Sequence, residues 1–133
     1  MKILIVEDNF TSRKLLHKHL SSYGDSDIAV NGKEAVEAFV SAHDAGEPYD
    51  LICLDIMMPE MDGQEALKEI RRIEEGMDIH GLGRVKIIMI TILDDRKNVM
   101  EAFKSQCDGY IIKPINRQDL LKIIDSFDSP QRD

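Results

Sequence analysis

The chain has 133 residues, 43% of them hydrophobic, with 17 Lys and Arg against 25 Asp and Glu, which gives a formal net charge of −8. This length is typical of one domain that needs no disulfide or zinc cross-link. The acidic balance argues against direct binding to nucleic acid. No apolar run approaches the roughly 20 residues that span a bilayer, and the apolar run before Glu7 is too short for a signal peptide. We therefore expect a cytoplasmic protein with no membrane insertion.

Five short apolar runs recur along the chain at intervals that leave room for a helix between them. The runs are nearly continuous rather than alternating, which is typical of parallel strands buried on both faces. They cover residues 3–6, 28–30, 51–54, 85–90 and 110–112.

Helical spacing of apolar residues appears in the five intervening or following segments, within residues 15–20, 35–40, 66–73, 99–103 and 120–124. Asn9 or Thr11 can cap the first helix and Asn116 the last. Alternating strands and helices predict an α/β fold, an open doubly wound parallel sheet built from right-handed crossovers.

The remaining segments suggest ordinary surface features. Residues 74–84, with three glycines, predict a surface loop, and the charge-rich residues 68–75 predict a solvated helix face. Cys53 and Cys107 lack a Cys-x-x-Cys pattern, so we expect two unpaired thiols.

Polar residues follow four of the apolar runs at their carboxyl ends. Glu7 and Asp8 follow the first run, Asp55 the third, Thr91 the fourth and Lys113 the fifth. Because the carboxyl ends of parallel strands meet in one crevice of an open sheet, we expect these side chains to converge there.

A site with this composition suits phosphoryl chemistry. Clustered carboxylates repel one another unless a cation compensates, and an all-oxygen ligand set favours Mg²⁺ over zinc. Lys113 and Thr91 would supply donors to an anionic group, and Asp55 could act as a nucleophile toward phosphorus.

Four motifs resemble those of the receiver domain of two-component response regulators, in particular the single-domain chemotaxis type. The resemblance covers residues 2–127 and implies a receiver domain at 1–127, a short frayed tail at 128–133 and no attached output domain. It also implies a flavodoxin-like five-stranded parallel sheet of order 2-1-3-4-5 with five helices. The motifs are Ile-Leu-Ile-Val-Glu-Asp-Asn at 3–9, Leu-Asp-Ile-Met-Met-Pro-Glu-Met-Asp-Gly at 54–63, Ile-Met-Ile-Thr at 88–91 and Tyr-Ile-Ile-Lys-Pro at 110–114.

The resemblance implies a role for each site residue. Asp55 would be the phosphoacceptor, while Glu7 and Asp8 would form the acidic pair, with Asp8 the more direct Mg²⁺ ligand. The backbone carbonyl of Met57 would be a third protein ligand of the metal. Lys113 would stabilise the phosphoryl group, and its peptide bond to Pro114 would be cis.

Thr91 and Tyr110 resemble the switch pair of such domains. Movement of the hydroxyl and the ring would reshape the face formed by the fourth helix, fifth strand and fifth helix. One residue departs from the pattern, because the position after the switch threonine is usually small and here is Ile92. We expect Ile92 to narrow access to Asp55 and slow its reactions, and the apolar Met57 and Leu93 to favour a long-lived phosphoryl form.

The expected function is a switch that accepts a phosphoryl group from a sensor histidine kinase or a phosphotransfer protein and then changes its binding to a separate downstream target. Such a protein catalyses only its own phosphorylation and dephosphorylation, so it is not an enzyme acting on other substrates. The sequence leaves its oligomeric state open between a monomer and a weak dimer.

Three alternative functions are weighed against this one. A pseudo-receiver would bind partners without phosphorylation, although the complete acidic, Thr and Lys set argues against it. A flavodoxin-like electron carrier would need a Ser, Thr and Gly-rich phosphate loop after the first strand, where this chain has Glu7 and Asp8. An aspartyl phosphatase would need a second acid two residues after Asp55, where Met57 stands.

Overall fold

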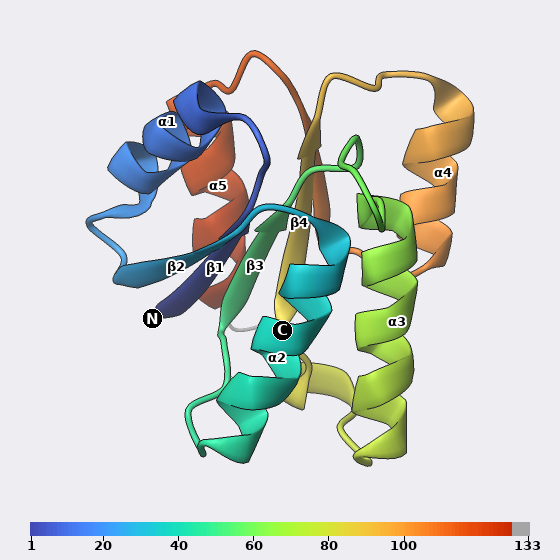
Figure 1. Cartoon of the computed structure of the whole chain (residues 1–133). Helices are drawn as coiled ribbons and strands as arrows, with labels where there is room; N and C mark the ends of the chain where they lie inside the picture. The colour runs from blue at the N-terminus through green and yellow to red at the C-terminus, as the bar shows by residue number, and fades with distance from the viewer. Residues whose placement is uncertain (129–133) are drawn as a thin grey trace.

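The computed structural model describes residues 1–128 and shows one parallel sheet with helices on both faces (Figure 1). The strand order is β2-β1-β3-β4-β5, and all neighbouring strands are parallel. This confirms the fold class and the strand order expected from the sequence. The elements are β1 (Lys2–Val6), α1 (Phe10–Leu20), β2 (Asp25–Ala29), α2 (Gly32–Asp44), β3 (Leu51–Leu54), α3 (Gly63–Gly76), the 3₁₀ turn η1 (Gly81–Gly83), β4 (Lys86–Thr91), α4 (Arg96–Lys104), β5 (Gly109–Ile112) and α5 (Arg117–Asp128).

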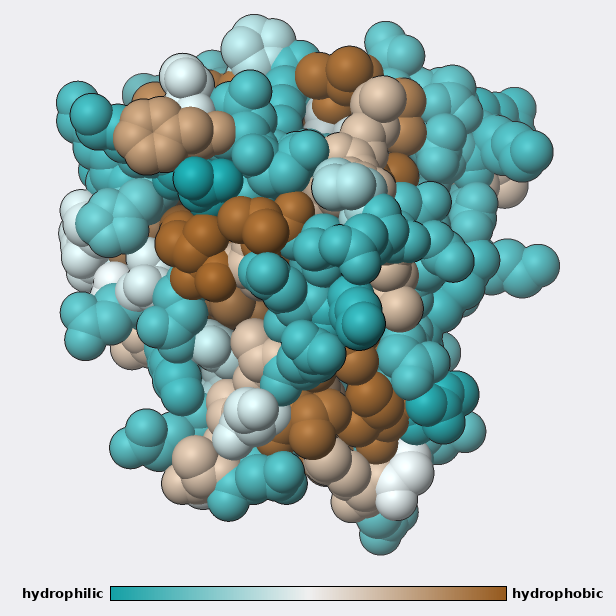
Figure 2. Space-filling view, in the orientation of Figure 1, coloured by the Kyte–Doolittle hydropathy of each residue, from teal (hydrophilic) through white to brown (hydrophobic). Residues whose placement is uncertain are grey.

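The hydrophobic core has two halves, one on each face of the sheet. Helices α1 and α5 cover one face, and α2, α3 and α4 cover the other (Figure 1). Alternate residues of β1 serve the two halves: Ile3 and Ile5 pack with Leu16 of α1, while Leu4 packs with Phe39 of α2. Burial on both faces explains why this strand has a continuous apolar sequence. The outer face viewed in Figure 2 is mostly hydrophilic, interrupted by hydrophobic patches.

The second strand differs from its prediction. β2 spans Asp25–Ala29 rather than residues 28–30, and Asp25, Asp27 and Ile28 are exposed. β2 is an edge strand of the sheet, so much of its outer surface meets solvent and its sequence carries no apolar run.

The prediction of a surface loop over residues 74–84 was wrong at its start, because α3 continues through Gly76. The prediction of a solvated face over residues 68–75 was also wrong at two positions, because Arg71 is 9% exposed and Glu74 only 1%. These two residues follow Leu67 and Ile70 at helical spacing, which turns them toward the core.

Arg71, Glu74 and Asp108 form a largely buried ion cluster that we call the Arg71 clamp. Arg71 donates from Nη1 to Glu74 Oε1 at 2.7 Å and from Nη2 to Asp108 Oδ2 at 2.9 Å. The backbone N–H of Val85 donates to Glu74 Oε2 at 2.7 Å, and that of Ile87 donates to Asp108 Oδ2 at 2.9 Å. The clamp therefore fixes the carboxyl-terminal half of α3 against the starts of β4 and β5.

Helix caps follow the sequence closely. The side chain of Asn9, rather than that of Thr11, accepts a hydrogen bond from the backbone of Ser12 at 2.9 Å and caps α1. Asn116 accepts from the backbone of Asp119 at 3.2 Å before α5. Within the described residues, no helix is both long and apolar enough to cross a membrane. Helix α5 ends at Asp128, and the rest of the expected tail, residues 129–133, lies outside the described part of the chain.

Candidate functional site

Of the five polar residues expected to converge, the structure brings four together in one crevice and places the Thr91 side chain against the backbone of Leu93. Oxygen atoms of Glu7, Asp8 and Asp55 lie within 4.8 Å of one another. Lys113 reaches into this group from the end of β5, and its Nζ donates to Glu7 Oε1 at 2.5 Å and to Asp55 Oδ2 at 3.1 Å. We call these four residues the acceptor cluster.

Backbone hydrogen bonds hold three members of the acceptor cluster at the ends of the strand ladders. The N–H of Glu7 donates to the carbonyl of Ala29 at 3.0 Å, and that of Asp55 donates to the carbonyl of Val6 at 3.0 Å. The N–H of Lys113 donates to the carbonyl of Thr91 at 2.8 Å. Each residue thus continues its strand by one step, so the sheet itself sets the position of each side chain.

The electrostatics of the acceptor cluster are unbalanced, because three carboxylates share one ammonium group. Burial raises the pKa of the Glu7 carboxyl, the hydrogen bond from Lys113 opposes this, and the charge of Asp55 raises it further. Burial acts to lower the pKa of Lys113, but the hydrogen bond to Glu7 and the two carboxylate charges outweigh it and raise that pKa. Glu7 and Asp55 are buried, whereas Asp8 is exposed, so the cluster opens to solvent on the side of Asp8.

The loop from Asp55 to Asp62, which we call the acceptor loop, is fixed at both ends. Gly63 lies so close to it that a Cβ atom there would sit 2.1 Å from the carbonyl oxygen of Asp55. The N–H of Gly63 donates to the carbonyl of Ile56 at 2.9 Å, and Asp62 forms a capping box with Glu65 at the start of α3. A side chain at position 63 would therefore displace the backbone of Asp55.

Met57 lies on the acceptor loop directly beside the carboxylates. Its N–H donates to Asp55 Oδ1 at 3.3 Å, and its side chain is half exposed. A hollow of about 500 Å³ opens between Asp8 and the start of α4, lined by Asp8, Ile56, Met57, Met58, Pro59, Asp62, Leu93 and Asn98.

Thr91 and Tyr110 are joined through a single intermediate residue. Thr91 is fully buried at the end of β4, and the N–H of Leu93 approaches its Oγ1 at 3.4 Å. The hydroxyl of Tyr110 donates to the carbonyl of Leu93 at 2.7 Å. Burial raises the pKa of Tyr110 to about 12, so the phenol keeps its proton as a donor at neutral pH. Ile92 stands between Thr91 and Leu93 with its side chain 61% exposed.

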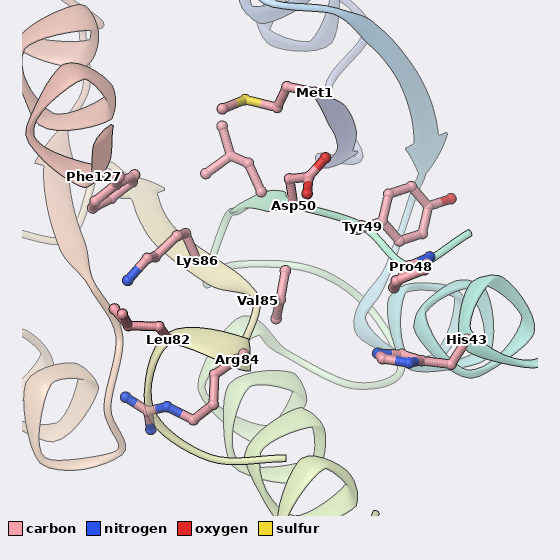
Figure 3. Close-up of a pocket in the computed structure, with 12 residues that line it drawn as sticks. Met1, His43, Pro48, Tyr49, Asp50, Leu82, Arg84, Val85, Lys86 and Phe127 are labelled. Atoms are coloured by element: carbon pink, nitrogen blue, oxygen red, sulfur yellow. The ribbon is translucent and has the colours of Figure 1, made fainter. Parts of the chain in front are cut away.

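A second hollow lies at the opposite end of the sheet. It has a volume of about 500 Å³ and opens at the amino ends of β3 and β4, where Asp50 and Lys86 lie (Figure 3). Lys86 Nζ lies 5.4 Å from the centre of the Phe127 ring there. This hollow is remote from the acceptor cluster and holds none of its residues.

Sequence reasoning missed two features. Gln64, only 5% exposed, reaches from α3 to Asn98 of α4 beside the site. The Arg71 clamp lies further along α3, away from the site, and Arg71 also donates there to the carbonyl of Gln106, just after α4. The signal available was the helical spacing of Gln64, Lys68 and Arg71 along one face of α3.

Comparison with known proteins gives one consistent family. The profile of the response regulator receiver domain matches residues 3–125. The chain is 32% identical over 130 residues to the osmosensing histidine protein kinase SLN1 of Saccharomyces cerevisiae, covering 96% of this chain and 10% of that protein. It is 34% identical over 126 residues to the probable transcriptional regulator ycf27 of Cyanidium caldarium, covering 94% and 45%. The chain thus spans less than half of the length of either relative.

Solved structures show the same likeness. A chain of the CheX–CheY–BeF₃–Mg²⁺ complex of Borrelia burgdorferi is 28% identical with a TM-score of 0.82, covering 95% of this chain and 87% of that one. The receiver domain of the Arabidopsis thaliana histidine kinase CKI1, complexed with Mg²⁺ and BeF₃⁻, is 29% identical with a TM-score of 0.81, covering 96% and 89%. With the profile matching nearly the whole chain, this protein belongs to the response regulator receiver domain family of two-component signalling.

Proposed function

We propose that this chain is a phosphorylation-dependent switch whose acceptor is Asp55. The observation that carries the proposal is the placement of Asp55: the residue is 6% exposed, and its carboxylate contacts Lys113 and lies within 4.8 Å of two further carboxylates. The donor would be a phosphohistidine of a sensor histidine kinase or a phosphotransfer protein. A bond forms between an Asp55 oxygen and phosphorus, the P–N bond breaks, and the histidine nitrogen keeps the electron pair and takes a proton.

The residues of the acceptor cluster fit Mg²⁺. Their donor set is all oxygen and carries more negative charge than Lys113 neutralises. Asp8 and Asp55, with the carbonyl of Met57, would hold the ion, and Glu7 would support them. When bound, Mg²⁺ would neutralise charge on the transferring group. The Mg²⁺ in the two solved relatives supports this assignment.

The chain's own residues would do the rest of the work. The Lys113 ammonium would stabilise negative charge on the phosphoryl oxygens, and the Thr91 hydroxyl would donate to one of them. A shift of Thr91 would disturb Leu93 and, through its carbonyl, Tyr110. We propose that this movement changes the face formed by α4, β5 and α5, where Met100, Phe103 and Ile112 are about half exposed, and so changes binding to a separate target protein.

We further propose that the phosphoryl form decays slowly. Met57 and Leu93 line the hollow beside Asp8 with apolar side chains that cannot orient an attacking water, and Ile92 lies next to them in the chain. Replacing Ile92→Ala should speed phosphoryl uptake from a small donor. Unchanged rates of uptake and decay would remove the proposed role of Ile92.

The setting of the switch is also a proposal. The free thiols of Cys53 and Cys107 suit a reducing compartment, so we propose that the protein is cytoplasmic. We also propose that the receiver domain covers residues 1–127. We propose a monomer or a weak dimer that does not contact nucleic acid directly, in keeping with the net charge of −8.

The decisive experiment is phosphorylation by phosphoramidate in the presence of Mg²⁺, followed by intact mass. The wild type should gain the mass of one phosphoryl group and Asp55→Asn should not. Asp44→Asn, an exposed carboxylate at the end of α2, is the matched control and should be labelled like the wild type. Persistent labelling of Asp55→Asn would reject the acceptor. A wild type that takes no label would favour a phosphorylation-independent interaction module.

A further inference from the structure

We propose that Gln64 is a positioning residue that couples the acceptor loop to α4, as a second connection beside the one through Thr91, Leu93 and Tyr110. The inference rests on the proposed function, because it concerns how occupancy of Asp55 reaches α4. It is carried by the contacts at the two ends of Gln64, by the weak apolar packing of α4 and by one unpaired buried oxygen.

The backbone of Gln64 belongs to a tightly packed turn that contacts the backbone of Asp55. Its neighbour Gly63 packs directly on the carbonyl of Asp55 and donates to the carbonyl of Ile56. The capping box of Asp62 and Glu65 fixes the same turn of α3. Displacement of the Asp55 backbone is therefore transmitted to the first turn of α3 without an intervening flexible segment.

At its side chain, Gln64 holds the amino-terminal turn of α4. Its Nε2 donates to the backbone carbonyl of Asn98 at 2.9 Å and lies 3.3 Å from Asn98 Oδ1. Asn98 is itself held by Asp95, the N-cap of α4, which accepts from both the backbone and the side chain of Asn98. The contact thus fixes the start of the helix rather than an isolated side chain.

Helix α4 depends on such contacts because it buries little apolar surface. Ala102 is its one fully buried residue among those described, while Met100 and Phe103 are 56% and 50% exposed. Further along the same face of α3, Lys68 pairs with Glu101 at 2.6 Å and Arg71 donates from Nε to the carbonyl of Gln106 at 3.0 Å. These contacts of Gln64, Lys68 and Arg71, which we call the polar seam, therefore set the position of α4. Gln64 is the residue of the seam that lies next to Asp55.

The seam is incomplete at Gln64. Its Oε1 is buried and accepts no hydrogen bond from any described residue. An unpaired buried carbonyl raises the free energy of the arrangement that contains it, so this arrangement is poised to exchange with another position of α4. If Gln64 contacts α4 differently in these two positions, and phosphorylation of Asp55 favours one of them, thermodynamic linkage requires that removing the contact also changes the affinity of Asp55 for a phosphoryl mimic.

The test measures beryllofluoride binding with Mg²⁺ by calorimetry, alongside amide hydrogen exchange of α4. Gln64→Met keeps the side-chain volume but removes both the donor and the unpaired oxygen. We expect the dissociation constant to change about 2- to 10-fold, the range that corresponds to one hydrogen bond, with faster exchange in α4. Arg72→Met, which removes a surface ion pair within α3 that does not contact α4, is the control and should change the constant less than about 2-fold.

The outcomes separate this inference from the function on which it rests. A wild type that binds no beryllofluoride rejects the proposed function. If the wild type binds beryllofluoride and Gln64→Met has the same dissociation constant and the same α4 exchange, the function stands and only the role of Gln64 is overturned. Gln64→Glu, which places a carboxylate oxygen against the Asn98 oxygens, is the second variant if the first does not fold, and the same two measurements decide it.

Discussion

The molecule contains two largely buried clusters in which one cation bridges two carboxylates, and they differ in how these carboxylates are completed. In the Arg71 clamp, one guanidinium bridges Glu74 and Asp108 near the amino ends of β4 and β5. In the acceptor cluster, one ammonium bridges Glu7 and Asp55 at the carboxyl ends of β1 and β3. Both join distant segments of chain around a single cation.

The difference lies in what completes each cluster. In the clamp, the backbone N–H groups of Val85 and Ile87 donate to the carboxylates at 2.7 and 2.9 Å. In the acceptor cluster, the corresponding backbone bonds are longer, at 3.2 Å to Glu7 and 3.3 Å to Asp55, and Asp8 adds a further negative charge. The carboxylates of the clamp thus find their hydrogen-bond donors within the protein, whereas the acceptor cluster leaves negative charge that a ligand can neutralise.

The largest expected effect is loss of the clamp. Arg71→Met should lower the free energy of unfolding by about 3–5 kcal/mol, because it leaves the buried Glu74 and the partly buried Asp108 without their cation. Arg72→Met is the control, since Arg72 pairs with Glu69 on the surface and should change stability by less than about 1 kcal/mol. Urea unfolding measures both, and equal losses would contradict the structural role of the clamp.

Lys113→Met should have a smaller effect, about 1–3 kcal/mol, because the acceptor cluster opens to solvent at Asp8. The two clusters should also differ in rescue. Adding Mg²⁺ should restore part of the stability lost in Lys113→Met, where carboxylates await a cation, and none of that lost in Arg71→Met. Thermal unfolding with and without Mg²⁺ compares them, and equal rescue of both variants would remove the distinction.

Mg²⁺ itself should stabilise the wild type by about 1.4 kcal/mol at ten times its dissociation constant. Asp8→Asn should abolish that gain, because it removes one of the carboxylate charges that would hold Mg²⁺. Asp44→Asn should keep it. A melting temperature of the wild type that is indifferent to Mg²⁺ would count against the metal site.

A further effect, confined to alkaline pH, concerns the two thiols. Burial raises the pKa of Cys107 to about 11 and that of Cys53 to about 12, against 9.0 for an ordinary thiol. Both folded thiols therefore stay protonated where unfolded ones ionise, so their contribution to stability is full below pH 9 and is lost as the pH rises toward 11. The double variant Cys53→Ala and Cys107→Ala should lose less stability than the wild type between pH 8 and 10, measured by urea unfolding.

Much of the fold and the acceptor cluster could be predicted because both depend on local patterns. The strand ends at Glu7, Asp55 and Lys113 are marked by apolar runs, and parallel pairing brings such ends together whatever the helices do. β2 was misplaced because an edge strand needs little apolar sequence. Arg71 and Gln64 were missed because their partners lie 37 and 34 residues away, and a single sequence does not show which distant polar groups meet.

The exposed acidic residues of β2 affect how two copies of this chain could pair along the edge of the sheet. The strand leaves one edge of the sheet open, and Asp25 and Asp27 are exposed on it. Two copies aligned along this edge would bring carboxylates of like charge together, which opposes the continuous intermolecular sheet that open edges otherwise nucleate. We therefore expect charge on the outermost strand to disfavour edge-to-edge aggregation.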